Sequence, residues 1–302
     1  MNYQNFNLTN TLINPMKNLI KTLPQLLLLA IVISSCENEE IVKTQELLSE
    51  EQTLAVVESE TIEDELDNVI DDFFGAIEIE IGSKIETEDK SQGQREGLLS
   101  CVTKTVVLTA TEKSVTLDFG EGCETPKEDV LKGIIKMDFE WNFAEGTVTI
   151  LKSFEDFYFN DVLVEGSKTI IKTRSNANEV PESVVTFDMK LTWANGSFAE
   201  RTGTRTRTFI EGFDTRPYAD NVFSIVGNAT TTLIDGTVIS SEILEPLIRN
   251  MACRYIVSGV KTMIKEGKTY TLDFGDGECD NKATLTVDGE TTEIELRKKR
   301  RK

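Results

Sequence analysis

The sequence predicts an all-β fold: an antiparallel meander, arranged as a sandwich or a large twisted sheet, preceded by a short acidic helix. Three observations support this prediction. From about residue 100 onward, segments rich in Val, Ile, Thr and Phe alternate apolar and polar residues, as half-buried strands do. Asn-Gly and Asp-Gly dipeptides separate several of these segments. A hairpin unit flanked by two cysteines occurs twice, near the beginning and near the end of the strand-rich region.

The composition excludes several functional classes. The 302 residues include 52 acidic and 32 basic side chains and no histidine, and the net charge is −20. Without imidazole the chain has no Ser-His or Cys-His catalytic pair, no His-ligated zinc and no His-ligated haem. The negative charge repels phosphate backbones, so nucleic acid is not expected as a partner.

The first element is a secretion signal over residues 1–35. Basic residues follow Met16, an apolar run extends from Leu23 to Ile33, and small residues precede Cys36. The apolar run is far shorter than the ~20 residues that a transmembrane helix needs, which favours a cleaved signal peptide. Met16 is the expected start of this signal.

The cysteine at the end of the signal predicts a lipid anchor. Ile33-Ser34-Ser35-Cys36 resembles a bacterial lipobox, in which the cysteine is acylated. Two or more acyl chains hold a protein stably on a bilayer. The alternative is an ordinary signal with an incidental cysteine. Removing Cys36 leaves four of the five cysteines, an even number that suits an oxidising compartment.

Residues 36–98 are expected to form an acidic tether that contains a short helix. Positions 37–90 hold 19 acidic and 3 basic residues. The run Glu37-Asn38-Glu39-Glu40 resembles the acidic patch that marks surface export in Bacteroidetes-type lipoproteins. The alternative is a solvated linker, because self-repelling charges extend a chain and hold a domain off a membrane.

Apolar residues at helical spacing predict an amphipathic helix over about 61–75, with Thr61 and Asp64 as a capping box. These apolar residues are Ile62, Leu66, Val69, Ile70, Phe73 and Phe74. The stripe must be covered, either by the following domain or by a partner protein. The polar residues 86–98 that follow are typical of a linker.

The strand-rich domain is expected over residues 99–296, and a basic tail over 297–302 is expected to be a disordered, solubilising end. The expected strands are Lys132 to Phe143, Thr147 to Phe159, Val162 to Thr173, Ser183 to Trp193, Thr202 to Ile210, Val222 to Leu233, Ala252 to Ile264, Lys268 to Phe274, Ala283 to Val287 and Thr291 to Leu296. Two-residue hairpins are expected at Asn195-Gly196, Asp235-Gly236 and Asp288-Gly289, because these dipeptides accept positive φ.

The cysteine-flanked units predict two disulfides. The midpoint of Cys101 and Cys123, and that of Cys253 and Cys279, each falls on a turn candidate. Folding each unit about its turn brings its two cysteines opposite each other, within reach of a disulfide. The symmetry favours 101–123 with 253–279 among the three connectivities. The alternative is a clasp between the two hairpins, such as 101–279.

These features together resemble a group of Bacteroidetes-type outer-membrane or surface lipoproteins with Cys-flanked Asp-Phe-Gly hairpins. The resemblance rests on four stretches of the sequence besides Cys36. They are Asp118-Phe119-Gly120 with Cys123, Arg205-Thr206-Arg207 with Ile210-Glu211-Gly212, Cys253 to Gly259, and Cys279 to Thr284. The resemblance implies secretion, anchoring at the outer membrane and β structure, and it implies no catalytic activity.

The two hairpin units carry acids at matching places, which makes Ca²⁺ the one metal worth considering. Asp118 and Glu121 in the first unit correspond to Asp273 and Asp276 in the second, and Ca²⁺ takes six to eight oxygen ligands. The alternative is turn chemistry, because Asp and Gly are what tight turns require. That alternative is favoured, and no other cofactor is expected.

Two further sets of residues are candidates for ligand binding. Arg201, Arg205 and Arg207 share one strand face and could bind a uronic acid or another carboxylate, or be neutralised by Asp188 and Glu200 nearby. Structural neutralisation is favoured. Trp141 alternates with Phe139 and Phe143 and would stack on sugars if exposed, but alternation favours a core position, as it does for Trp193.

The sequence thus predicts a lipid-anchored protein at the cell surface, on the outer membrane, acting as a non-enzymatic structural or binding module. One alternative is a glycan-binding accessory or a glycoside hydrolase that uses a carboxylate pair. Another is an accessory subunit of an outer-membrane complex, with the helix at 61–75 as the contact. Whether the chain is an enzyme is left open, and the absence of a catalytic signature favours a binding role.

Overall fold

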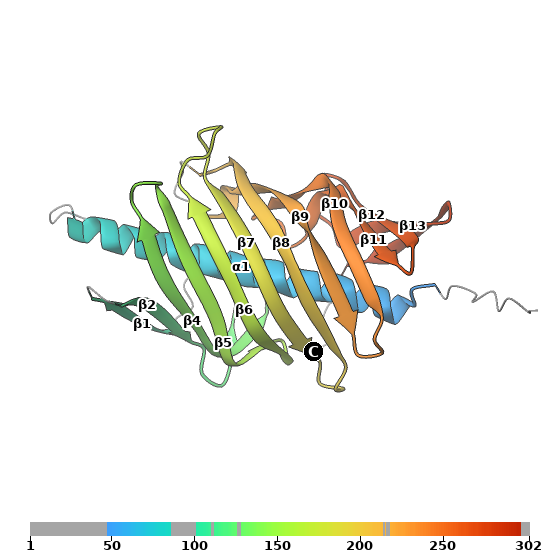
Figure 1. Ribbon diagram of the computed structural model, residues 1–302, viewed down its shortest axis with the longest axis horizontal. Coiled ribbons are helices and arrows are strands. Elements are labelled where there is room, and N and C mark those ends of the chain that lie inside the picture. The colour runs from blue at the N-terminus through green and yellow to red at the C-terminus, as the bar shows by residue number, and fades with distance from the viewer. Residues whose placement is uncertain are drawn as a thin grey trace, which may run out of the picture. The chain divides into compact units, whose positions relative to one another are not determined.

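The computed structural model describes residues 47–85, 101–109, 112–125, 128–213, 215 and 218–296, with the helix side chains described for residues 51–68. These residues all belong to one compact unit, 45–302 (Figure 1). The predicted signal peptide, Cys36 with the acidic run after it, the predicted linker 86–98 and the predicted basic tail 297–302 lie outside the described residues. Within the described ranges, no helix has the length and apolar character needed to cross a bilayer.

The predicted all-β meander is confirmed, and it takes the form of one large antiparallel sheet. Its strands are β1 (Thr103–Leu108), β2 (Lys113–Asp118), β3 (Cys123–Glu124), β4 (Val130–Asn142), β5 (Thr147–Phe159), β6 (Val162–Thr173), β7 (Glu182–Thr192), β8 (Phe198–Glu211), β9 (Val222–Leu233), β10 (Val238–Asn250), β11 (Ile256–Lys265), β12 (Lys268–Asp276), β13 (Lys282–Val287) and β14 (Glu290–Glu295). Their spatial order follows the chain from β1 to β14, except that the short β3 pairs beside β4.

The three predicted hairpins join neighbouring antiparallel strands, as expected, but the number of residues in the loop differs from the prediction at two of them. Asp288 and Gly289 both have positive φ, and Val287 pairs directly with Glu290, so this loop has two residues. At the other two sites the loop has three residues, because Trp193 N–H donates to the Ser197 carbonyl, and Leu233 N–H to the Thr237 carbonyl. Only the glycine of those dipeptides has positive φ. The prediction of two-residue turns at 195–196 and 235–236 is therefore wrong.

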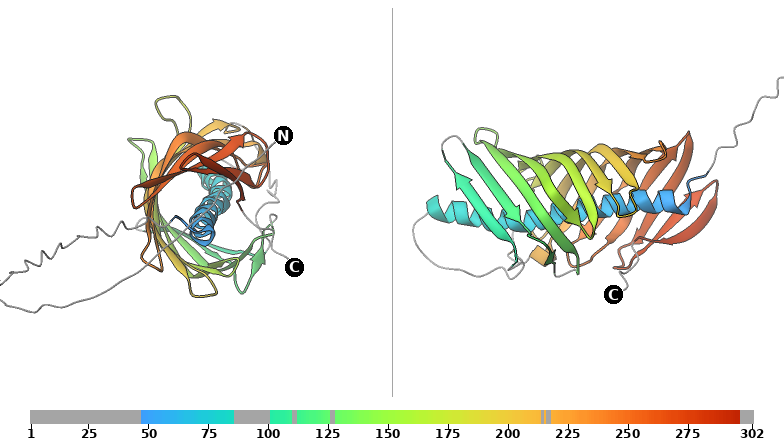
Figure 2. Two further views of the ribbon diagram at one scale, coloured as in Figure 1. Left: turned by 90° about the vertical axis from the view of Figure 1, so that its right-hand side faces the viewer. Right: turned by 90° about the horizontal axis from the view of Figure 1, so that it is seen from below.

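A single long helix, α1 (Glu50–Ile85), lies against the concave face of the sheet. Figure 2 shows the sheet curving around α1. The predicted helix at 61–75 is present but extends further in both directions. Its first turn is closed by a reciprocal capping box, in which Gln52 N–H donates to Ser49 Oγ and Ser49 N–H donates to Gln52 Oε1. Thr61 instead donates its hydroxyl to the Val57 carbonyl within the helix, so the capping box predicted there is wrong.

Removing the Ser49 hydroxyl tests this helix start. We expect Ser49→Ala to lower the free energy of unfolding by about 1 kcal/mol, because the Gln52 N–H loses its acceptor. Urea unfolding followed by circular dichroism measures the change. Ser175→Ala, at an exposed position of the β6–β7 loop outside the helix, is the control, and an equal loss in both variants would contradict a specific role for the cap.

The core lies between α1 and the concave face. Ile62 and Leu66 of α1 pack with buried residues of β2 and β4 to β7, such as Leu117, Ile150 and Leu191. One turn earlier, Val57 packs with buried residues of the last strands. The domain itself therefore covers the described part of the apolar stripe, as one of the two sequence-based alternatives expected.

Glycines inside strands permit the close approach of neighbouring strands in this curved sheet. At Gly166, with φ of +105°, an added Cβ would lie 2.1 Å from the Asp188 carbonyl oxygen. At Gly227, with φ of +145°, it would lie 2.2 Å from the Thr204 carbonyl oxygen. Interior glycines with positive φ bend strands and mark local register changes.

Both predicted disulfides are formed. Cys101 bonds to Cys123 and Cys253 bonds to Cys279, each with a Cα–Cα distance of 5.6 Å. A clasp between the two cysteine units also exists, but it is ionic: Arg254 donates to Asp129 Oδ1 at 2.8 Å across 125 residues of sequence. The loop after Cys253 is thereby held against the loop that follows Cys123.

Candidate functional site

The most distinctive feature of the structure is a set of buried ion pairs between α1 and the sheet. Basic side chains of five strands point from the concave face toward the helix, and all but Arg205 are almost completely buried. They are Lys152, Lys168, Arg201, Arg205, Arg207, Arg249 and Lys261. The helix presents carboxylates at i, i+3, i+4 and i+7, the spacing that places side chains on one helix face. They are Glu60, Glu63, Asp64 and Asp67, joined by Glu65.

Asp67 is shared by two lysines. Its Oδ1 lies 3.2 Å from Lys152 Nζ and 2.9 Å from Lys168 Nζ. These lysines are directly paired across β5 and β6, and both are at most 1% exposed. Like charges placed opposite each other in a sheet repel, so the Asp67 carboxylate is what allows the two ammonium groups to lie side by side.

The arginines of β8 contact the acidic residues in the middle of this buried series on α1. Arg201 Nε donates to Glu63 Oε1 at 2.7 Å, and its Nη2 lies 3.3 Å from Glu60. Arg205 contacts the other oxygen of Glu63 at 3.3 Å. Glu60 also pairs with Lys261 of β11. One helix turn therefore joins strands that are far apart in the sequence.

Arg249 of β10 connects the helix to the second cysteine loop. Its guanidinium contacts Asp64 at 2.7 Å and Glu65 at 2.8 Å. Its Nη1 also donates to the carbonyl oxygens of Cys253 and Tyr255. This one side chain thus holds the loop that carries the ionic clasp described above.

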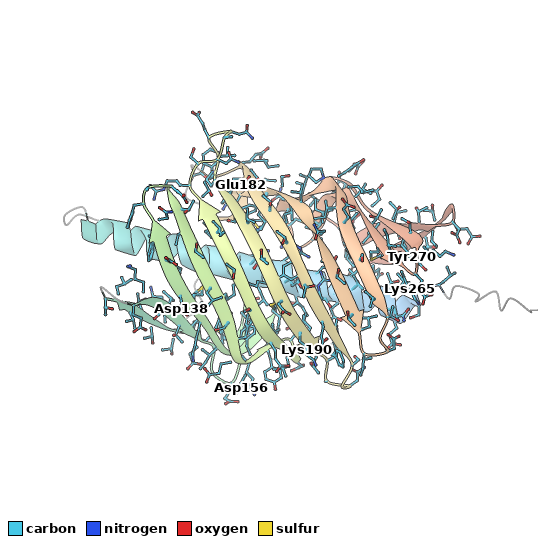
Figure 3. The ribbon with its side chains drawn as sticks, viewed as in Figure 1. Asp138, Asp156, Glu182, Lys190, Lys265 and Tyr270 are labelled. Atoms are coloured by element: carbon cyan, nitrogen blue, oxygen red, sulfur yellow. A yellow bond between two sulfur atoms is a disulfide. The ribbon has the colours of Figure 1, made fainter. Side chains whose placement is uncertain are left out.

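The start of α1 is held by the end of the sheet. Leu48 N–H donates to the Tyr270 hydroxyl at 2.8 Å, and Lys265 donates to Gln52 Oε1 at 3.3 Å (Figure 3). Gln52 also donates to Asp235 and Thr237 in the β9–β10 loop. The helix is therefore fixed from Leu48 to Asn68 by partners in the sheet.

The electrostatic environment lowers the pKa of three helix carboxylates, those of Glu60, Asp64 and Asp67. Burial by itself would raise the pKa of Glu60, but Lys261 and Arg201 outweigh it and lower the pKa to about 2. The pKa of Asp64 is lowered by Arg249, and that of Asp67 by Lys168 and Lys152, in each case against the effect of burial. Burial likewise opposes the raised pKa of Arg201, which Glu63 and Glu60 produce. Lys261 differs from Arg201, because burial outweighs its pairing with Glu60 and lowers the pKa of its ammonium group.

This arrangement shows what the predicted arginine row contacts. The carboxylates that meet Arg201 and Arg205 belong to α1, and Arg207 donates to Asn68 Oδ1 at 2.8 Å. The expected partners in the sheet are engaged elsewhere or point away: Glu200 pairs with Lys190 at 3.1 Å on the outer face. Neutralisation of the row is structural, as the sequence favoured, but its source is the helix.

The aromatic candidates divide between the core and the surface. Trp141 is partly buried, stacks on Phe139 with ring centroids 5.6 Å apart, and packs against the core. Trp193 is also at the core edge and donates its indole N–H to Glu58 of α1. Phe143, at the end of the same row as Trp141, is 88% exposed. Trp141 therefore does not share a surface with the outer pocket described below.

The hairpin acids take part in turns. Asp118 accepts a hydrogen bond from Gly120 N–H at 2.8 Å, and Asp273 accepts one from Gly275 N–H at 2.9 Å, so the two units share this local contact. Glu121 pairs with Lys132. Within the described ranges, no group of three His, Cys, Asp or Glu side chains is placed to hold a metal ion. Calcium binding at Asp118, Glu121, Asp273 and Asp276 stays a prediction.

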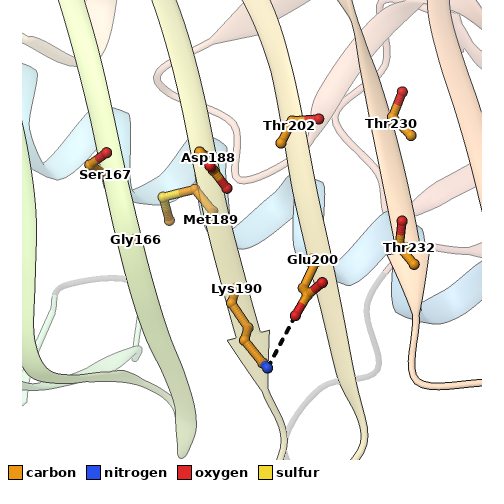
Figure 4. Close-up of a pocket in the computed structure, with 9 residues that line it drawn as sticks. All are labelled: Gly166, Ser167, Asp188, Met189, Lys190, Glu200, Thr202, Thr230 and Thr232. Carbon is orange, nitrogen blue, oxygen red and sulfur yellow. Dashed lines mark ion pairs between the residues drawn. The ribbon is translucent and has the colours of Figure 1, made fainter. Parts of the chain in front are cut away.

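The outer face of the sheet carries a pocket that the sequence did not indicate. It has a volume of about 380 Å³ and lies across β6 to β9, on the side that points away from α1 (Figure 4). Its lining residues are Gly166, Ser167, Asp188, Met189, Lys190, Glu200, Thr202, Thr230 and Thr232. The threonines at every second position of β8, from 202 to 208, were the sequence signal for this surface.

A scan against protein-family models, a search of the curated proteins and a search of the solved structures found no match to this chain.

Proposed function

We propose that this chain is a lipid-anchored protein of the outer membrane that holds a β-sheet domain at the cell surface as a non-enzymatic structural or binding module. The lipobox at Cys36 and the acidic patch that follows it support the anchor and the surface location. The observation that carries the proposal is the ion-paired helix. It begins at Glu50, only 14 positions after the proposed lipidated cysteine.

The helix is suited to fasten a domain to its anchor. It directly follows the proposed tether, and its partners lie on β5, β6, β8, β10 and β11, so a pull on the tether is distributed over the sheet. Removing one partner of a buried ion pair costs about 3–5 kcal/mol, so several such pairs resist separation of helix and sheet. The sheet would therefore stay attached to the membrane through its ion pairs with α1, even if the covalent connection between α1 and β1 were cut.

The structure also bears on the accessory-subunit alternative. That alternative uses the apolar stripe of the helix as the contact with a partner protein. In the described part of the stripe, Ile62 and Leu66 are buried in the domain's own core, so they are not free to bind a partner. This observation favours a module whose helix is used internally.

Two cleavage sites in the full chain test the proposal. One specific protease site is inserted in the tether at 37–46 and the other in the linker at 86–98, in separate variants expressed on whole cells. We expect cleavage in the tether to release the domain from the membrane fraction. Cleavage in the linker should leave the sheet on the membrane, because α1 holds it through the ion pairs.

Fatty-acid labelling completes this test. Radiolabelled palmitate should be incorporated into the wild-type chain and lost in Cys36→Ser, while Cys253→Ser, which removes a disulfide cysteine, should keep the label. Absence of label in the wild type would overturn the anchor. Release of the sheet by cleavage in the linker would overturn the fastening role of α1.

A further inference from the structure

We infer that the outer pocket across β6 to β9 is a binding site for an uncharged saccharide. This inference rests on the proposed function, because it names the class of ligand that the displayed sheet would bind at the surface. Four observations carry it: the shape of the pocket, the alignment of its polar side chains, their lack of internal partners and the balance of charge.

The pocket lies where short side chains on the outer face stand beside longer ones. Ser167 and Thr202 flank Asp188 across β6 to β8, and the longer Lys190 and Glu200 border the hollow on the neighbouring row. Gly166 adds only backbone to the lining. The volume of the hollow, about 380 Å³, is within the range of small-molecule sites.

The polar side chains form two parallel rows across the strands. Ser167, Asp188, Thr202 and Thr230 are successive register partners, and Lys190, Glu200 and Thr232 form the neighbouring row. Adjacent strands are roughly 4.8 Å apart and alternate residues on one strand about 6.8 Å apart. Hydroxyl and carboxylate groups thus form a grid of donors and acceptors, which suits a ligand with several hydroxyl groups on one rigid ring.

One row of this grid is free to bind. Within the described residues, no hydrogen bond or ion pair engages the Asp188 carboxylate or the hydroxyls of Ser167, Thr202, Thr230 and Thr232. Lys190 is different, because it pairs with Glu200 at 3.1 Å and lies over the Phe198 ring at 4.2 Å. A fixed ion pair therefore borders a row of unengaged acceptors and donors. A carboxylate can accept hydrogen bonds from two hydroxyls of a sugar.

The charged side chains that line the pocket favour an uncharged ligand. The pocket has two carboxylates and one ammonium group, and that ammonium is already paired. A uronic acid or a phosphate would meet the Asp188 carboxylate with no free cation to compensate it. A neutral saccharide satisfies this condition.

Calorimetric titration of the full-length lipoprotein in detergent tests this inference. The probes are cellohexaose, maltohexaose, mannohexaose and xylohexaose, with hexagalacturonate as the acidic counterpart. We expect at least one neutral probe to bind, and hexagalacturonate to bind at least tenfold more weakly. Asp188→Asn and Thr202→Val should each weaken the binding of that neutral probe about tenfold or more.

Thr206→Val is the matched control, because Thr206 lies on the same strand and the same face but outside the pocket. It should change the affinity less than twofold, and the thermal unfolding of all three variants should match the wild type. Failure of every neutral probe, stronger binding of hexagalacturonate, or equal weakening by Thr206→Val would overturn the inference. Palmitate labelling of the same preparation tests the anchor separately, so a failure of the pocket is distinguishable from a failure of the proposed function.

Discussion

Asp67→Asn is expected to destabilise the domain by about 3–5 kcal/mol. The substitution keeps the size of the side chain but removes the charge that Lys152 and Lys168 share. Two buried ammonium groups then face each other across β5 and β6 without that carboxylate, and an uncompensated buried charge is costly. The free energy of urea unfolding measures the loss.

A surface pair provides the control for this prediction. Lys190 and Glu200 lie 3.1 Å apart with 38% and 53% of their side chains exposed, so Glu200→Gln should change stability by less than about 1 kcal/mol. A triple variant, Asp67→Leu with Lys152→Met and Lys168→Met, should recover most of the stability, because apolar residues often replace a buried ion pair without loss. Equal effects of Asp67→Asn and Glu200→Gln would contradict the special role of the interior pairs.

The second large effect is expected in acid. The pKa of Glu60 is lowered to about 2, and those of Asp64 and Asp67 are lowered as well. The unfolded chain therefore takes up protons at a higher pH than the folded chain, and stability falls as the pH falls. The contribution of these groups is complete above their ordinary pKa values, near 4 to 4.5, and is lost down to the folded values. For Glu60 alone the change amounts to about 3 kcal/mol.

Thermal unfolding at a series of pH values checks this prediction. The melting temperature should be nearly constant from pH 7 to 5 and should fall steeply below about pH 4. In Lys261→Met, which removes one cation from Glu60, the loss of stability in acid should be smaller and should end at a higher pH, because the folded pKa of Glu60 is less depressed while its unfolded pKa, which sets where the loss begins, is unchanged. Lys282→Met, on the exposed Lys282–Glu293 pair, should leave the profile unchanged. A melting temperature that stays constant down to pH 2.5 would contradict the prediction.

Local patterns predicted the strands well because period-two alternation and turn dipeptides act within a few residues. The bounds of β5, β6 and β9 match the prediction. Two strands, the short β3 (Cys123–Glu124) and the long β10 (Val238–Asn250), were not predicted. The miss of β10 has a physical reason. The alternation in β10 is interrupted where its pairing with β9 shifts between Glu242 and Leu247, and that stretch includes Pro246. A bulge of this kind hides a strand from a pattern that assumes constant spacing.

The interior ion pairs were not predicted because the usual reading of an amphipathic helix places charges toward solvent. Glu60, Glu63 and Asp67 point toward the sheet instead. Their partners lie more than 80 residues away in the sequence, so no local window contains both. A signal was present, since Lys152 and Lys168 stand at inward positions, two residues from the buried Ile150 and Ile170.

The distances along the chain between these partners have a consequence for folding. Along the chain, Glu63 is separated from Arg201 by 138 positions, Glu65 from Arg249 by 184, and Glu60 from Lys261 by 201. During synthesis from the N-terminus, the acidic segment of α1 is therefore made long before the basic residues that pair with it. Non-local contacts of this kind slow folding, because loop closure must be completed before they form. The domain should reach its native state only after β11 is available, which makes folding of the whole sheet a late and cooperative event.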